Sequence, residues 1–163
     1  MQTGLAAGVA VRDITPASPQ HLHGYSARHE PSVGLLEPLS LRCLALGQGE
    51  RRLLIVAVDM VGIPHPVCRR WYDLLERATG IGFPNILVSC THTHFAPALH
   101  ATVYTNPEAG LVEPDPAYAA AVEERLVEAA REALARLQPA VLETARAPVP
   151  GVLYNRQIGR AHV

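Results

Sequence analysis

The sequence has almost no net charge and no long hydrophobic run, and each absence excludes a class of protein. The formal net charge is -1 over 163 residues, so no excess of basic residues is available to neutralise phosphates. We therefore expect no nucleic-acid partner. The longest apolar run, residues 53–58, is far shorter than the roughly 20 residues that a membrane-spanning helix needs. No transmembrane segment is predicted.

Cysteines are few, and the start of the chain has none of the marks of a secretion signal. Cys43, Cys68 and Cys90 are odd in number and form no C-x-x-C pair, so a disulfide framework is not expected. Residues 1–11 contain no Lys or Arg ahead of the apolar stretch, unlike a secretory signal peptide. These features predict a cytoplasmic protein. The hydrophobic fraction of 48% is that of an ordinary globular domain.

What the sequence does contain is an alternation of strand-like and helix-like segments. We expect strands over residues 8–11, 39–46, 53–61, 85–90 and 140–145, and helices over residues 64–78 and 116–137. A short glycine-containing turn joins the second and third strands, which predicts a hairpin. The fold class is therefore α/β, with a mixed sheet flanked by helices. The third strand is almost continuously apolar, which predicts that both of its faces are covered.

Two long segments without periodicity, residues 15–38 and 91–115, adjoin the ends of strands. Ligands of α/β proteins usually bind at such places, and long loops in compact domains are usually functional or disordered. We therefore expect the functional residues to lie on these loops.

The most specific motif is Thr91-His92-Thr93-His94, directly after an apolar strand. In extended backbone, side chains two residues apart point to the same side, so the two imidazoles would project together. Imidazole is a common zinc ligand, and a catalytic zinc takes about three protein ligands and one water. The alternative is that the pair is incidental, being polar side chains where a loop begins.

Other polar residues give weaker signals. His21 and His23 form a second H-x-H inside the first loop, where a metal site is less expected. Asp59 ends a strand, and it could either orient a histidine ligand or bind loop amides. The remaining candidates are expected to be solvated or hydrogen-bonded without a role in the site: Arg28, His29, Glu30, His65 and His100.

The order of these segments resembles the neutral/alkaline non-lysosomal ceramidase family. Residues 8–16 resemble the family's opening G-x-x-x-x-D-I-T, and Gly24-Tyr25 matches its next glycine–tyrosine pair. Residues 38–46 look like its P-L-x-x-R-x-L strand, and residues 54–59 look like its buried strand that ends in Asp. Residues 85–94 resemble its most specific segment, N-V-L-L-x-x-T-H-T-H, and residues 154–156 resemble its later N-R.

This resemblance implies a zinc-dependent hydrolase of C–N amide bonds, similar to an N-acylsphingosine amidohydrolase, with a small-molecule or lipid amide as substrate. In the family pattern His92 is a Zn²⁺ ligand, and His94 is a catalytic polar partner of the reacting carbonyl. The other family ligands, a His, a Glu and a Tyr, come from beyond residue 163. The family continues T-H-T-H with S-G-P-G-G, whereas this chain continues with residues Phe95 to Leu99, so ceramide itself is not assured as the substrate.

The end of the sequence suggests that the chain is incomplete. The final six residues, Ile158 to Val163, match the translation of a common sequencing adapter, and a CAG codon for Gln157 would match the adapter bases that come before it. We expect residues 1–156 to be the N-terminal part of a ceramidase-like zinc hydrolase domain and residues 157–163 to be a sequencing artefact. The partner of this part would then be the C-terminal part of the same protein, and the chain alone would be inactive.

Two other functions remain open at this point. One is a non-catalytic binding or structural domain in which the histidine pair is incidental. The other is a metal-dependent hydrolase of the amidohydrolase-barrel type, which also carries H-x-H at a strand end. There the pair normally follows the first strand, whereas here at least two strands and a helix come first.

Overall fold

The computed structural model describes residues 4–25, 27–100, 113–148 and 151. Tyr154-Asn155-Arg156 and residues 157–163, for which the sequence made specific predictions, lie outside the described residues. The elements in chain order are β1 (Ala6–Asp13), β2 (Ser40–Gln48), β3 (Arg51–Val58), α1 (His65–Thr79), β4 (Ile86–Cys90), α2 (Pro116–Ala135) and β5 (Gln138–Pro139).

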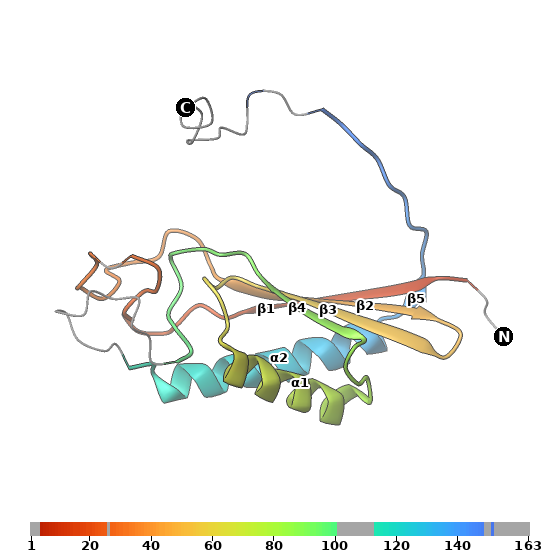
Figure 1. The fold of residues 1–163 in the computed structure, drawn as a ribbon, viewed down its shortest axis with the longest axis horizontal. Coiled ribbons are helices and arrows are strands. Elements are labelled where there is room, and N and C mark those ends of the chain that lie inside the picture. The colour runs from red at the N-terminus through yellow and green to blue at the C-terminus, as the bar shows by residue number, and fades with distance from the viewer. Residues whose placement is uncertain (1–3, 26, 101–112, 149–150, 152–163) are drawn as a thin grey trace, which may run out of the picture.

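The strands form one mixed sheet in the order β4-β3-β2-β1-β5, which Figure 1 shows nearly edge-on. β3 and β4 are parallel, and the other neighbouring strands are antiparallel. The predicted hairpin is confirmed: Gln48 pairs with Arg51, and Gly49 takes a φ of 59° in the turn, a conformation that glycine adopts without strain. Within the described residues the sheet is open and mostly antiparallel, whereas the strands of a (β/α)8 barrel are all parallel.

Both helices begin and end close to the predicted residues, and both lie on the same face of the sheet (Figure 1). α1 ends at Gly80, whose φ of 73° is left-handed, as is common after a helix. α2 begins at Asp115, whose carboxylate accepts a hydrogen bond from the Ala117 amide at 2.9 Å. Neither helix in the described part of the chain has the length and hydropathy needed to cross a bilayer.

The prediction that β3 is covered on both faces is wrong. Leu54, Val56 and Val58 are fully buried toward the helices, but the alternate residues of β3 are only partly buried. On the same outer face, Val9 and Leu87 remain 52% and 53% exposed. The reason is that both helices pack against one side of the sheet (Figure 1), so the described residues cover β3 on one face only.

The predicted strand at residues 140–145 is also wrong. β5 consists of Gln138 and Pro139, which pair with the first residues of β1. The Ala140 amide donates to the carbonyl of Leu5, and beyond this point β1 offers no further residues to pair with. Val141 and Leu142 are accordingly 86% and 76% exposed, and the segment leaves the sheet (Figure 1).

Candidate metal and catalytic site

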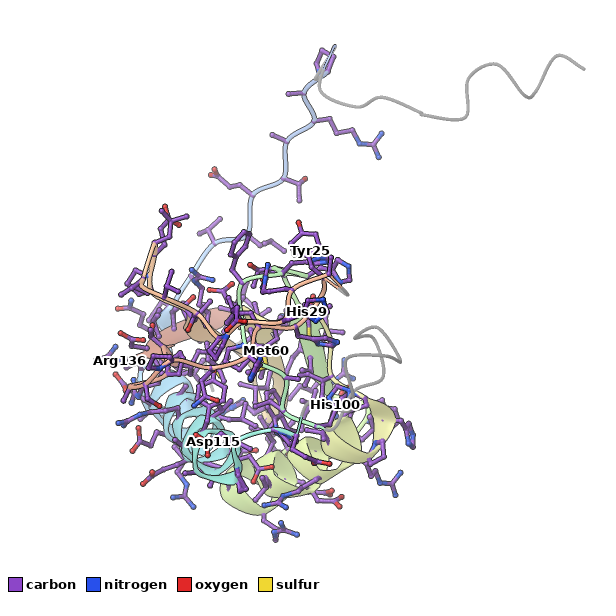
Figure 2. The ribbon with its side chains drawn as sticks, turned by 90° about the vertical axis from the view of Figure 1, so that its left-hand side faces the viewer. Tyr25, His29, Met60, His100, Asp115 and Arg136 are labelled. Atoms are coloured by element: carbon purple, nitrogen blue, oxygen red, sulfur yellow. The ribbon has the colours of Figure 1, made fainter. Side chains whose placement is uncertain are left out.

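The two long loops meet at one end of the molecule. Leu22 of the first loop forms an isolated antiparallel bridge with Pro97 of the second. The His23 amide donates to the carbonyl of Ala96 at 2.9 Å. β3 and β4 are parallel and both end here, so the polar residues that follow them are neighbours. Figure 2 looks onto this end, where Tyr25 and His100 are carried by the two loops.

His92 sits at a sharp turn directly after β4. Its φ of 63° is left-handed, which is uncommon for a residue with a side chain. Hydrogen bonds from the Thr91 and His92 amides to the carbonyls of Val58 and Met60 hold the turn. The sequence predicted that extended backbone would align His92 with His94; instead the turn brings the two rings together, with centroids 5.1 Å apart.

The ring of His92 is oriented by a backbone contact. Its Nδ1 lies 2.6 Å from the carbonyl oxygen of Val61. A carbonyl oxygen can only accept, so Nδ1 carries a proton, and in the neutral imidazole Nε2 therefore keeps its lone pair. Metal-binding histidines commonly donate their other ring N–H in this manner. The arrangement therefore fits His92 as a ligand through Nε2.

His94 packs between the two loops. Its ring makes an edge contact with Tyr25, with centroids 4.7 Å apart, and its Nδ1 is buried without a hydrogen-bond partner among the described residues. Gly24 has a φ of +113°, and a Cβ there would lie 2.5 Å from Cγ of His94. Only glycine fits this contact, which gives a physical reason for the Gly24-Tyr25 pair.

Arg28 belongs to the site, although the sequence predicted a solvated residue. Its Nη1 donates to the carbonyl of His94 at 2.8 Å. Its guanidinium carbon lies 4.9 Å from the ring centroid of Tyr25 and 5.3 Å from that of Phe95, within cation–π range. By contrast, His29, Glu30 and His65 are exposed, in agreement with the prediction.

His23 and His100 form a second imidazole pair beside the first, and the sequence did not predict this pair. Their ring centroids are 5.8 Å apart. Burial lowers the pKa of His23, and the nearby His100, His94 and His92 lower it further; burial also lowers the pKa of His100. The only signal in the sequence was the H-x-H at residues 21–23, of which His21 is exposed and His23 is buried.

Asp59 binds backbone and hydroxyl groups, which is the second of its two predicted roles. Its Oδ2 accepts from the amide and hydroxyl of Ser40 at 2.9 and 2.6 Å, and its Oδ1 lies 3.6 Å from Arg42. Burial opposes ionisation, but hydrogen bonds from Ser40 and Thr91 and the charge of Arg42 outweigh it and lower the pKa of Asp59. Asp59 therefore anchors Thr91, the residue before His92.

A cavity of about 610 Å³ lies beside the motif. Thr93 and Phe95, which alternate with the two histidines, contribute to its lining, together with Leu22, Leu36 and Arg42. The lining mixes apolar residues with three charged ones, Glu37, Arg42 and Asp59, so the cavity could accept an apolar chain that carries a polar group.

A complete metal site is not present in the described part of the chain. No three His, Cys, Asp or Glu side chains there are placed to share one ion. His92 therefore fits zinc as a single oriented ligand. A zinc site with three protein ligands would need further donors besides the described side chains.

The chain is similar to known proteins in both sequence and fold. The sequence model described as neutral/alkaline non-lysosomal ceramidase, N-terminal, matches residues 5–159. The structure of neutral ceramidase from Pseudomonas aeruginosa superposes with a TM-score of 0.68 at 22% identity, covering 85% of this chain and 23% of that one. A structure titled as a ceramidase complexed with C2 gives 0.67 at 23% identity, covering 84% and 22%. None of the curated proteins matches in sequence.

Proposed function

Because the chain belongs to the neutral/alkaline non-lysosomal ceramidase family, we propose that it forms one part of the catalytic domain of a zinc-dependent amide hydrolase. The substrate is a lipid-like amide of the N-acylsphingosine kind. The chain spans less than a quarter of the length of the ceramidase chains that it resembles. The proposal therefore concerns a larger catalytic domain, of which this chain forms one part.

The observation that carries this proposal is the contact between His92 and Val61. With Nδ1 held at 2.6 Å from a carbonyl oxygen, the imidazole presents Nε2 as a zinc ligand without rotating. Zinc, when bound, supplies Lewis acidity that activates water toward a carbonyl carbon. His92 is the ligand that this chain provides. The others are proposed to come from parts of the catalytic domain outside it.

His94 is proposed to bind the carbonyl oxygen of the substrate as it gains charge. Its ring contacts that of His92, and its Nδ1 has no partner among the described residues. A buried polar nitrogen without a partner costs roughly 1–3 kcal/mol, and a substrate oxygen would relieve that cost. Preorganised donors of this kind stabilise developing oxyanions. Arg28 positions His94 by binding its carbonyl.

The cavity beside Thr93 and Phe95 is proposed to take the apolar part of the substrate. Its volume of about 610 Å³ is in the range of ligand pockets. Phe95 stands where the family pattern T-H-T-H-S-G-P-G-G has a serine, so the cavity is proposed to differ in shape from that of a ceramidase. We therefore propose that the preferred amide differs from ceramide in the group that contacts Phe95.

The 163-residue chain alone is proposed to be inactive, because its described residues supply no third ligand. The test compares this chain with a longer protein that contains it and the remainder of the catalytic domain. Zinc content and hydrolysis of N-acyl amides of graded chain length are measured for both proteins, and for the longer protein with His92→Ala and His94→Ala. Zinc bound by the longer protein, with hydrolysis lost in both variants, supports the proposal. Hydrolysis by the short chain contradicts its inactivity, and a longer protein that binds no zinc favours a non-catalytic binding domain.

A further inference from the structure

We propose that His23 and His100 form a second site for a divalent transition-metal ion, separate from the ligand position at His92. The two imidazoles would hold the ion, and water or a substrate oxygen would complete its coordination. This inference does not depend on amide hydrolysis, because it concerns two side chains that the proposed reaction does not use.

The backbone holds the two histidines in place before any ion binds. The bridge between Leu22 and Pro97 and the hydrogen bond from the His23 amide to Ala96 fix the first histidine against the second loop. Residues 96–99 of that loop are all buried, so the segment that leads to His100 is anchored in the core. The pair is therefore preorganised, which lowers the entropy cost of binding.

The distance between the rings suits shared coordination. Imidazole nitrogens lie about 2.0–2.1 Å from zinc, so two rings on one tetrahedral ion have centres roughly 5–6 Å apart. The centroids of His23 and His100 are 5.8 Å apart, and the ring planes are inclined at 81°. A simple edge-to-face contact also falls in this range, so the distance alone does not distinguish the two arrangements.

The unsatisfied nitrogen of His100 favours coordination over simple packing. Its Nδ1 is buried and has no hydrogen-bond partner in the described part of the chain. Edge-to-face packing leaves this atom without a partner, at a cost of roughly 1–3 kcal/mol. A metal ion or a group bound to it would use that nitrogen. His23 provides the second imidazole, and this residue is only 8% exposed.

The chemistry of the pair indicates which ions it would select. No third His, Cys, Asp or Glu completes a set here among the residues that the structure describes, so the ligands are two neutral nitrogens. Imidazole suits Zn²⁺, Ni²⁺ and Cu²⁺, whereas Mg²⁺ and Ca²⁺ prefer oxygen ligands. We expect moderate affinity for the first group and no measurable binding of Mg²⁺.

The test is a calorimetric titration of the His92→Ala chain with Zn²⁺, in which the other proposed ligand is absent. We expect this chain to bind Zn²⁺, and we expect His23→Ala or His100→Ala in the same background to weaken binding by about tenfold or more. The matched control is His29→Ala with His65→Ala, which removes two exposed histidines and should leave the affinity unchanged. Absence of zinc binding by the His92→Ala chain, or an affinity unaffected by His100→Ala, would overturn the proposal.

A second measurement avoids substitution of the pair, because His23 is buried and its variants could unfold. Traces of Cu²⁺ are added to the His92→Ala chain, and broadening of the imidazole proton signals is followed by NMR. We expect the signals of His23 and His100 to broaden before those of His29 and His65. Broadening that begins at the exposed histidines would contradict the site. Neither measurement uses hydrolysis, so either can fail while the proposed function holds.

Discussion

The α-carbon of Gly24 approaches the ring of His94 so closely that a Cβ would lie 2.5 Å from Cγ. The first loop therefore touches the T-H-T-H motif through a glycine whose φ of +113° also disfavours any side chain. The two long loops are fitted to each other at this point. Two separated sequence motifs, Gly24-Tyr25 and the histidine pair, thus form one structural unit.

Gly24→Ala should destabilise the fold, since it adds both a clash and an unfavourable backbone conformation. We expect a loss of about 1–3 kcal/mol in the free energy of unfolding, measured by urea denaturation. Gly34→Ala is the control, because a Cβ there meets nothing within 4 Å. Equal effects at the two positions would show that the contact with His94 is unimportant.

Asp59→Asn should reduce stability by about 1–2 kcal/mol at neutral pH, because hydrogen bonds to a charged acceptor are stronger than those to a neutral one. The pKa of Asp59 is lowered in the folded chain, so its contribution is present above the unfolded pKa of about 3.9 and is lost as pH falls through the folded pKa. Urea denaturation from pH 7 to pH 3 should therefore show a gap between the two chains that narrows below about pH 4.

The control for that series is Asp73→Asn, whose exposed carboxylate only reaches Arg69 at 4.0 Å within α1. Exposed pairs of this kind are worth about 0–1 kcal/mol, and we expect the difference between the control and the unaltered chain at pH 7 to lie near the low end of this range. A stability gap for Asp59→Asn that stays constant down to pH 3 would contradict a stabilising role for the partly buried Asp59 carboxylate.

The elements of the fold were predictable where the signal is local. The periodicity of α2, the prolines and glycines around α1, and the glycine turn of the β2–β3 hairpin each depend on neighbouring residues. The prediction of a strand at residues 140–145 was wrong for a non-local reason. Their pattern suits a strand, but β1 begins at Ala6 and its pairing to β5 ends with Pro139, so no partner is available for them.

The difference between local and non-local signals also explains which residues of the candidate site the sequence predicted. His92 and His94 were predicted as candidate site residues because a short motif after a strand identifies them. Arg28 was missed because its role depends on a hydrogen bond to a residue 66 positions away. His23 and His100 were missed because the pairing of Leu22 with Pro97 brings their loops together, and no pattern in either loop predicts that pairing.

Leu126 and Leu142 provide a direct test of the corrected C-terminal segment. Leu126 is fully buried in α2, whereas Leu142 is 76% exposed. Leu126→Ala should cost about 2–5 kcal/mol, and Leu142→Ala should stay within about 0.5 kcal/mol, both measured by urea denaturation. A large loss at Leu142 would show that residues 140–145 pack against the sheet after all.

Arg28 should contribute to stability through its contacts in the site. Arg28→Ala removes the hydrogen bond to the carbonyl of His94 and the contacts with the rings of Tyr25 and Phe95. We expect a loss of about 1–2 kcal/mol in the free energy of unfolding. Arg28→Lys should recover only part of this lost stability. A planar guanidinium can stack on an aromatic ring and at the same time donate hydrogen bonds in its own plane, which an ammonium group cannot do. Arg69→Ala, with a side chain 74% exposed, is the control and should change stability by less than about 0.5 kcal/mol. If Arg28→Lys restored full stability, a positive charge alone would be sufficient and the stacking contacts would not contribute to stability. If Arg28→Ala had no more effect than the control, Arg28 would be a solvated loop residue, as its sequence context first indicated.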